Sequence, residues 1–280
     1  MISAIILTWN SEKYIKKCIE HLVESVKNAD EQLEMIIVDN GSNDGTLILL
    51  EDIEKKFPNV CLIKLEKNRG TTYPRNLALK KARGEYVLFL DSDVEIEKNT
   101  VKQLLSEIKN NNEIGIVCPK LIYPDGILQI SFKKFPTLKT KVFKILATRF
   151  SFFKKLADKD ELYAERETNF YPDYCISACW LVRKKIFDKI GVFDENIFYA
   201  PEDVDFCLRV WLGGYCVLYT SSALAIHHTQ RVSYRNKKIA LSHAKGLLYY
   251  FNKYGCWFSR KGIYRKIKNP DAHFYYKEND

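Results

Sequence analysis

Short apolar runs alternate with amphipathic segments over the first 118 residues. Continuous apolar runs, typical of strands covered on both faces, lie at 2–8, 35–38, 60–65, 86–90 and 114–118. From Ile15 to Val26 the apolar residues fall on one face of an amphipathic helix, and further helices are predicted near 46–56, 73–83 and 101–108. Strands that alternate with helices of this length predict right-handed crossovers and a largely parallel sheet. The predicted fold class is therefore α/β.

The alternation stops after Pro119. Residues 120–170 are aromatic, basic and irregular, and we expect only a short helix near 142–146. Regular pattern returns with a strand at 176–182, helices at 184–190 and 204–212, an edge or closing strand at 216–219, and a helix at 236–254. We therefore expect one domain over 1–230, with halves at 1–118 and 119–230, and a helical basic tail over 231–280.

The charge of the chain is concentrated at its end. The residues after 230 supply the whole net charge of +9, because they include 12 basic and three acidic residues. We recognise no nucleic-acid-binding module in the sequence, so nucleic acid is not an expected partner. A basic tail interleaved with aromatic residues predicts peripheral contact with an anionic membrane surface. The alternatives are a solvated tail that binds nothing and a closing helix over 236–254 that packs on the domain.

Cysteine usage and hydropathy indicate the cellular compartment. The eight cysteines lie mostly within apolar runs of a chain with 46% hydrophobic residues, which favours reduced thiols over a disulfide framework. The pair Cys175 and Cys179 has no second cysteine or histidine cluster nearby, which disfavours a zinc site. We predict neither a signal peptide nor a membrane-spanning helix. The expected location is the cytoplasm, with peripheral contact at the inner face of the cell membrane.

Polar residues stand where four predicted strands end. In chain order these strand ends carry Thr8 and Asn10, Asp39, Asn68 and Arg69, and Asp91 and Asp93. Because the carboxyl ends of parallel strands meet at one edge of a sheet, we expect a ligand site there. Singly, each residue would serve a turn or a helix cap, and for Ser42, Asn43 and Asp44 that interpretation is favoured.

The two carboxylates of Asp91-x-Asp93 follow an apolar strand directly, which predicts a cation site. Carboxylate oxygens completed by phosphate oxygens and water are the usual environment of Mg²⁺ or Mn²⁺ bound with a nucleotide. The chain has neither G-x-G-x-x-G after the first strand nor a P-loop. A nucleotide would then be held through its base and through the metal on its phosphates. Asp39 is placed to accept a hydrogen bond from the ring N–H of uracil or thymine.

In this order and spacing, the motifs resemble the inverting family 2 glycosyltransferases with the GT-A fold, and among them the rhamnosyltransferase-like members that build bacterial surface polysaccharides. The resemblance runs from Ile5 to about Ser233. It rests on ILTWN, VDNGSNDGT, the N-x-G-x4-RN segment, LDSD and the stretch IGVFDENIFYAPEDVDFCLRVWLGGY. It implies a mostly parallel nucleotide-binding sheet flanked by helices, with the basic segment as a C-terminal helical extension.

The resemblance also implies a role for each matching position. Donor-binding positions are Thr8, Asn10, Asp39, Asn68, Arg75 and Asp91. Asp93 and His227 would hold Mn²⁺ or Mg²⁺, with His228 as the alternative histidine, and Asp203 matches the catalytic base. Trp180 and Glu202 are acceptor-binding candidates, and for Trp180 core packing is the alternative. The half at 1–118 would bind the nucleotide-sugar, and the half at 119–230 would bind the acceptor and supply the base.

The implied activity is inverting transfer of a sugar from a UDP- or dTDP-sugar to a hydroxyl of a glycan or lipid-linked acceptor. A non-catalytic nucleotide-sugar-binding subunit of an assembly complex is the alternative, which the presence of both LDSD and Glu202-Asp203 disfavours. A sugar-1-phosphate nucleotidyltransferase would need a Gly-rich basic loop after the first strand. The segment Trp9-Asn10-Ser11-Glu12 is not such a loop.

Overall fold

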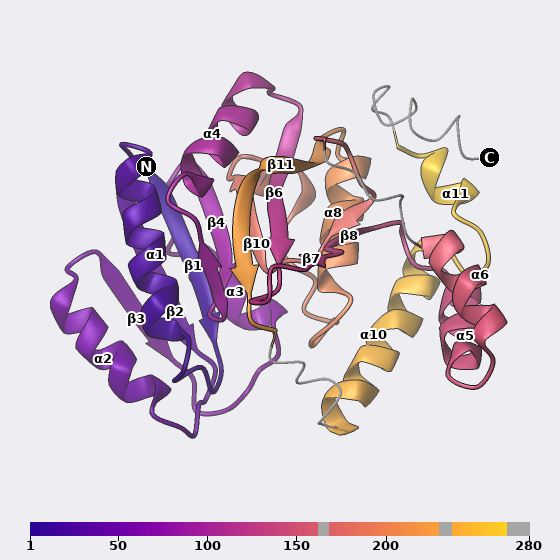
Figure 1. The fold of residues 1–280 in the computed structure, drawn as a ribbon, viewed down its shortest axis with the longest axis horizontal. Coiled ribbons are helices and arrows are strands. Elements are labelled where there is room, and N and C mark those ends of the chain that lie inside the picture. The colour runs from indigo at the N-terminus through magenta and orange to yellow at the C-terminus, as the bar shows by residue number, and fades with distance from the viewer. Residues whose placement is uncertain (162–167, 230–236, 268–280) are drawn as a thin grey trace.

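One mixed sheet forms the centre of the main body of the molecule (Figure 1). The computed structural model describes residues 1–161, 168–229 and 237–267, and for 237–239 only the backbone. The order of the sheet is β3-β2-β1-β4-β10-β6-β11-β5, with β7 paired to β6. Its strands are β1 (Ile2–Thr8), β2 (Leu33–Asp39), β3 (Val60–Lys64), β4 (Tyr86–Asp91), β5 (Val94–Ile96), β6 (Ile114–Ile122), β7 (Leu128–Gln129), β10 (Cys179–Arg183) and β11 (Cys216–His227). A second, two-stranded sheet joins β8 (Phe132–Lys133) and β9 (Tyr174–Cys175).

The first four strands form the parallel half, as predicted. In their register Thr8 lies opposite Asp39, and Leu7 lies opposite Asp91. The polar strand ends therefore do meet at one edge. The prediction of a largely parallel sheet is confirmed, because β6 and β11 run in the same direction as the first four strands, whereas β10, β5 and β7 run antiparallel to them. The fold class is α/β with a mixed sheet, and β6 crosses the expected boundary between residues 118 and 119.

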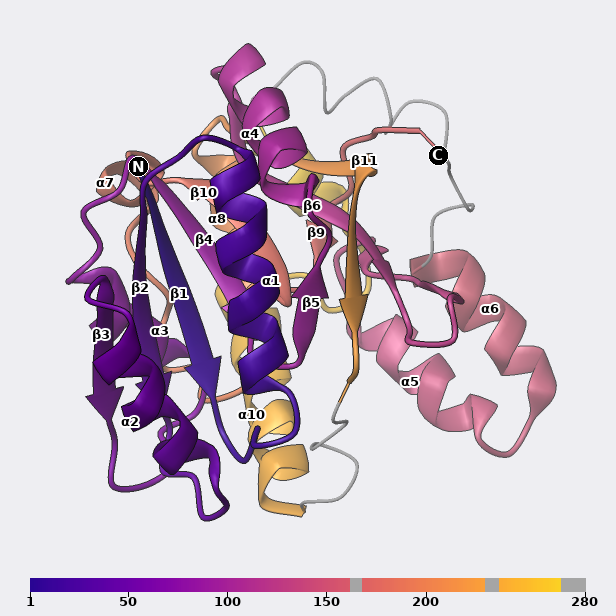
Figure 2. The ribbon, with the colours of Figure 1, turned by 60° about the vertical axis from the view of Figure 1, so that its left-hand side comes forward.

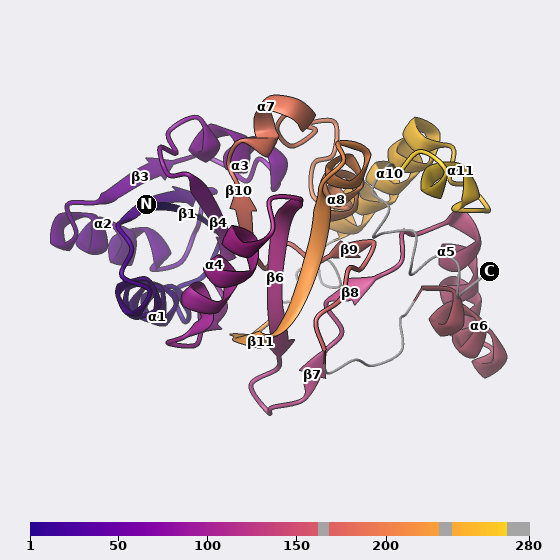
Figure 3. The same ribbon diagram turned by 90° about the horizontal axis from the view of Figure 1, so that it is seen from above.

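Helices cover both faces of this sheet (Figure 3). On one face lie α1 (Ile15–Asn28), α2 (Thr46–Lys56) and α4 (Thr100–Asn110). On the other lie α3 (Thr72–Leu79), α7 (Ile186–Ile190), α8 (Glu202–Leu212) and α10 (Lys237–Tyr254). The apolar stripe of α1 is buried against the sheet, which confirms the helix predicted from its spacing.

Strand β11 differs most from the expectation of a short edge or closing strand. It has 12 residues and lies between β6 and β5, so it is not an edge. Its pairing with β6 shifts register between Thr220 and Leu224, which lets the strand continue past the polar Thr220-Ser221-Ser222. The strand therefore ends at His227, beside Val94 of β5.

The segment left irregular by the sequence contains a helical hairpin, α5 (Leu138–Ala147) and α6 (Ser151–Glu161). The short helix expected at 142–146 is part of α5. Figure 2 shows that α5 and α6 extend from one end of the molecule, away from the main sheet. The hairpin is therefore attached mainly through its base.

The C-terminal part of the described chain packs on the domain. Tyr250 and Phe251 of α10 are buried, and so is Ile263 of α11 (Lys261–Tyr264). A Cβ added at Gly246 would lie 2.2 Å from the carbonyl oxygen of Ala200, so α10 contacts the loop before α8 closely. The closing helix is therefore the alternative that the structure supports. Several apolar residues on which the expected membrane contact rested are buried in the core instead, and residues 268–280 lie outside the described part.

The described chain shows the state of its cysteines and the hydropathy of its helices. All eight cysteines are free thiols, and seven of them are buried. Among the described residues, no helix is both long and apolar enough to cross a membrane.

Candidate active site

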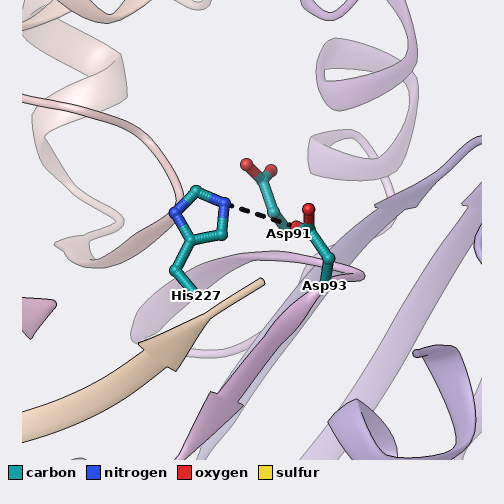
Figure 4. Close-up of side chains that lie close together, drawn as sticks. All are labelled: Asp91, Asp93 and His227. Carbon is teal, nitrogen blue, oxygen red and sulfur yellow. Dashed lines mark ion pairs between the residues drawn. The ribbon is translucent and has the colours of Figure 1, made fainter. Parts of the chain in front are cut away.

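Two aspartates and one histidine converge at the end of the parallel half of the sheet (Figure 4). Asp91 is the last residue of β4, Asp93 follows in the turn before β5, and His227 is the last residue of β11. One ligand atom from each lies within 4.8 Å of the others. Antiparallel pairing of β11 with β5 brings this late histidine back to the early DxD segment.

The chemistry and orientation of these three side chains fit a divalent cation. His227 Nδ1–H donates to Gln129 Oε1 at 2.9 Å, which directs Nε2 toward Asp93 Oδ1 at 3.5 Å. Carboxylate oxygens with one imidazole suit Mn²⁺ better than a soft metal. Burial raises the pKa of Asp91 despite the nearby Arg75 guanidinium. Asp93 is buried and Asp91 is half-buried, so both carboxylates would gain from a bound cation.

His228 has a different environment. Its Nε2 lies 2.8 Å from Glu95 Oε1, and its ring lies against Tyr14 with centroids 5.0 Å apart. Only its backbone N–H approaches the DxD segment, donating to the Asp93 carbonyl at 3.0 Å. Of the two adjacent histidines, the structure therefore places His227 in the cluster.

Arg75 joins the DxD segment to the start of α8. Its guanidinium is buried and donates to Asp91 Oδ1 at 3.0 Å, to Glu202 Oε1 at 3.2 Å and to Ser177 Oγ at 2.8 Å. This fixed cation holds the carboxylates of Asp91 and Glu202, which lie far apart in the chain. The arrangement makes the end of β4 and the N-terminus of α8 parts of one site.

The carboxylates of Glu202 and Asp203 begin α8 side by side. Burial and the neighbouring Asp203 charge raise the pKa of Glu202 to about 8, although Arg75 opposes the shift. Burial also raises the pKa of Asp203, opposed by the Val204 backbone N–H and by the charges of Lys133 and Arg75. Because the two carboxylates interact, they titrate as a pair. Both shifts favour a bound proton, and at Glu202 the Asp203 charge adds to the effect of burial.

Tyr199 shows that the acidic residues share one region. Burial raises the pKa of its phenol to about 12, and four carboxylate charges contribute to the shift. These charges belong to Glu202, Asp91, Asp203 and Asp93. Together with the bonds of Arg75 to Asp91 and Glu202, these contributions indicate that the DxD segment and the Glu202-Asp203 pair lie in one region.

At the other end of the site, Asp39 is held in a fixed orientation. Ser42 Oγ donates to Asp39 Oδ1 at 2.6 Å, Ser42 N donates to Oδ2 at 3.1 Å, and Thr8 Oγ1 donates to Oδ1 at 3.3 Å. Asn10 has a positive φ of 53°, and its Oδ1 accepts from Asn43 N at 2.8 Å. These contacts give Ser42 and Asn43 the turn-forming role expected for them.

A second loop at this edge is built around asparagines. Asn68 Oδ1 accepts from Gly70 N at 2.9 Å, so the side chain shapes its own turn. Asn40 is buried, accepts from Arg69 N at 2.8 Å and donates to the Gly70 carbonyl at 2.8 Å. The sequence reasoning missed Asn40, although its position directly after Asp39 at a strand end was a signal. It also missed Gln129 and Ser177, for which the sequence carried no comparable signal.

Trp180 is not available to an acceptor. Its side chain is fully buried on β10, and its ring stacks against Phe206 with centroids 6.0 Å apart. The acceptor-binding prediction for Trp180 is therefore wrong, and the alternative of core packing is confirmed. Glu202, the other acceptor candidate, is buried and paired with Arg75. Among the aromatic residues near α8, Phe198 is the exposed one.

Comparison with known proteins agrees with this geometry. Residues 3–191 match the model of glycosyl transferase family 2. TarS of Staphylococcus aureus, a poly(ribitol-phosphate) beta-N-acetylglucosaminyltransferase, is 37% identical over 134 residues, which cover 47% of this chain and 23% of TarS. The rhamnosyltransferase WbbL of Escherichia coli is 25% identical over 236 residues, covering 81% of this chain and 83% of WbbL. The match to TarS thus covers about a quarter of the length of TarS. A match to the uncharacterized glycosyltransferase YfnE of Bacillus subtilis covers 64% of the length of YfnE.

Solved structures show the same fold. S. aureus TarS 1-349 in complex with UDP-GlcNAc has a TM-score of 0.57 at 24% identity, covering 93% of this chain and 74% of that chain. GalNAc-T7 with UDP, GalNAc and Mn²⁺ has a TM-score of 0.60 at 15% identity, covering 81% of this chain and 43% of the other. At these identities the likeness establishes the GT-A fold. With the family match over residues 3–191, the chain belongs to glycosyltransferase family 2.

Proposed function

We propose that this protein transfers a sugar, with inversion, from a UDP- or dTDP-sugar to a hydroxyl of a glycan or lipid-linked acceptor in the synthesis of a bacterial surface polysaccharide. The observation that carries the proposal is the single site formed by Arg75, the DxD segment and the Glu202-Asp203 pair. The names of TarS and WbbL support the reaction class, and that of TarS supports a polymeric acceptor. In this proposal, residues 1–118 bind the donor, residues 119–230 bind the acceptor, and residues 231–280 form a C-terminal extension.

The donor would lie along the carboxyl edge of β1, β2 and β4. Asp39, held by Thr8 and Ser42, offers a fixed carboxylate to the ring N–H of uracil or thymine. Asn10 and Asn68 shape the loops on either side of it. The structural neighbours named above contain UDP or UDP-GlcNAc, which supports a uridine nucleotide as the first donor to test.

The diphosphate would lie at Asp91, Asp93 and His227. Asp93 and His227 would hold Mn²⁺ or Mg²⁺, which when bound neutralises charge on the leaving phosphate oxygens. The solved structure of GalNAc-T7 with Mn²⁺ supports the choice of ion. Gln129 orients His227, and Arg75 fixes the side chain of Asp91, which would contact the donor ribose.

Asp203 would act as the general base. The acceptor oxygen forms a bond to the anomeric carbon while the bond from that carbon to the diphosphate oxygen breaks, and the nucleoside diphosphate leaves with the electron pair. Asp203 accepts the proton of the attacking hydroxyl. A single displacement of this kind inverts the anomeric configuration. Glu202 keeps its own proton near neutral pH, because burial and the Asp203 charge raise its pKa to about 8.

The experiment that tests this assignment measures donor binding and transfer separately. Calorimetry with UDP and Mn²⁺ reports donor binding, and product formation from a panel of UDP- and dTDP-sugars reports transfer. In Asp203→Asn we expect donor binding within about twofold of the wild type and transfer reduced by about 10²- to 10⁴-fold. Full transfer by Asp203→Asn would refute the base assignment.

The same assays address the alternative of a non-catalytic nucleotide-sugar-binding subunit. Wild-type protein that binds the donor with Mn²⁺ but neither transfers nor hydrolyses it would support that alternative. Protein that turns the donor over only with the metal present would support the transferase. We propose a cytoplasmic location at the inner face of the cell membrane, where a lipid-linked acceptor is reached without crossing the bilayer.

A further inference from the structure

The tip of the α5–α6 hairpin exposes apolar side chains to solvent. Four large apolar residues between 142 and 152 are exposed by 42% to 69%: Val142, Ile145, Phe150 and Phe152. They are four of 13 such residues among those the structure describes, gathered within 11 positions of sequence. Single exposed apolar residues need no explanation, but a group of this density marks an interaction surface.

These side chains form an organised tip. Phe153 is half-buried, and its ring lies 5.8 Å from that of Phe143, 6.3 Å from that of Phe150 and 5.8 Å from that of Phe152, centroid to centroid. The rings therefore support one another between the end of α5 and the start of α6. On α5, Val142 and Ile145 are three residues apart and so lie on the same side of the helix.

The charge around the tip has a single sign. Residues 138–155 contain six basic residues and no acidic one. Lys141 lies 3.5 Å from Glu161, and Lys144 pairs with the same carboxylate, so Glu161 offsets part of the charge of these two lysines. The other four are all exposed: Lys139, Arg149, Lys154 and Lys155. Lys139 acts on Asp160 at the base of the hairpin, whereas Arg149, Lys154 and Lys155 place positive charge beside the apolar tip.

The hairpin is held at its base. Arg260 Nη2 lies 3.1 Å from Asp160 Oδ2, and Leu138 N donates to the Trp257 carbonyl at 2.8 Å. These contacts tie the start of α5 and the end of α6 to the C-terminal part of the domain. The tip lies at the far end, as Figure 2 shows, and is presented away from the sheet. The folded domain therefore fixes the position of this surface.

We propose that the α5–α6 tip is a membrane-docking surface that inserts Phe150, Phe152 and Ile145 into the interface of an anionic bilayer. Apolar side chains flanked by lysine and arginine are the pattern of helices that lie in such an interface. A second copy of this chain is a poorer partner, because it would place the same positive charges against each other. The proposal concerns a different surface from the one assigned to sugar transfer and goes beyond that function.

The position of the hairpin links membrane docking to the access of a lipid-linked acceptor to the site. Lys141 of α5 and Lys133 of β8 both act electrostatically on the Asp203 carboxylate, so the base of the hairpin lies near the proposed catalytic base. A bilayer contacted by the tip would bring a lipid-linked hydroxyl toward this end of the site.

The test is sedimentation of the full chain with large vesicles of phosphatidylcholine and phosphatidylglycerol in a 7:3 ratio, compared with pure phosphatidylcholine. We expect binding to the anionic vesicles that weakens with salt. The variant Phe150→Ser/Phe152→Ser should bind about 100-fold more weakly, since each ring contributes about tenfold. Lys154→Gln/Lys155→Gln should lose about fivefold per lysine. Ile48→Ser is the matched control, because Ile48 is 67% exposed on α2, and should bind like the wild type.

Three outcomes would overturn the proposal. They are equal binding of the wild type and Phe150→Ser/Phe152→Ser, equal binding to anionic and pure phosphatidylcholine vesicles, and a wild-type dimer without vesicles that Phe150→Ser/Phe152→Ser converts to a monomer. The last would identify the tip as a contact between copies. UDP binding measured on the same samples shows that the variants are folded. Because vesicle binding does not require transfer, its result and the test of Asp203 are independent.

Discussion

The pKa of Glu202 leads to a quantitative prediction about folding stability. Its carboxyl group is buried beside Asp203, and its pKa rises from 4.5 to about 8 in the folded protein. A carboxyl group with a raised pKa binds its proton more tightly in the folded state. The wild type is therefore most stable below pH 4.5 with respect to this group, and it loses that stability as the pH rises from 4.5 toward 8. Each pH unit in this window costs about 1.4 kcal/mol.

Glu202→Gln removes this dependence. The glutamine is nearly isosteric with the protonated carboxyl group, and its Oε1 can still accept from Arg75 Nη1, as the Glu202 oxygen does at 3.2 Å. The free energy of unfolding of Glu202→Gln minus that of the wild type should then increase by about 2 to 3 kcal/mol between pH 5 and pH 7. Other titrating groups are common to both proteins and largely cancel in the difference.

Urea unfolding at pH 5, 6, 7 and 8, followed by circular dichroism, measures this difference directly. Asp203→Asn at the same pH values serves as the control, because it neutralises the other member of the pair. A Glu202→Gln curve that runs parallel to that of the wild type from pH 5 to pH 8 would refute the reasoning. It would mean that Glu202 is ionised in the folded protein and that Arg75 outweighs the burial.

Initial rates of transfer at pH 7 should distinguish Glu202 from Asp203. Glu202→Gln should keep transfer within about tenfold of the wild type, whereas Asp203→Asn should lose about 10²- to 10⁴-fold. Asp93→Asn should raise the Mn²⁺ concentration needed for half-maximal UDP binding by at least about tenfold, as measured by calorimetric titration, and an unchanged requirement would remove Asp93 from the metal site. Gly70→Ala should lower the unfolding free energy by about 2 kcal/mol or more, because φ is +82° and the added Cβ would lie 1.9 Å from the Phe198 carbonyl oxygen. Gly126→Ala, with φ of +83° and no atom within 4 Å of its Cβ, should cost only about 1 kcal/mol, and equal losses in urea unfolding would contradict the steric argument.

The parallel half of the fold and its site were predictable from the sequence because both follow from local patterns. Apolar runs fix β1, β2 and β4, and strands that run parallel must deliver Thr8, Asp39 and Asp91 to one edge. The family resemblance added Asp203 and His227, which no local pattern connects to that edge. In the structure these two residues reach it through the start of α8 and the end of β11.

Beyond β6, the sequence pattern was insufficient for a physical reason. The continuation of β11 depends on a register shift after Thr220, and such a shift leaves no periodic signal in the chain. Trp180 was misjudged because its aromatic ring fits a sugar platform and an apolar core equally well, and only its packing against Phe206 decides. Gln129 acquires its contact with His227 from a short strand, β7, that has two residues.

The reversal of strand direction at β10 is what makes one site out of two halves. A further parallel strand after β4 would place its own carboxyl end beside Asp91. Because β10 runs antiparallel, the chain instead enters β10 at this edge, where the Ala178 carbonyl accepts from Asp91 N at 2.9 Å and Ser177 Oγ accepts from Arg75. The segment before β10 thereby closes the site on the side of α8, and Arg75 can bond to residues from both halves. The second half thus contributes acidic and hydroxyl groups to an edge that the first half alone would leave open.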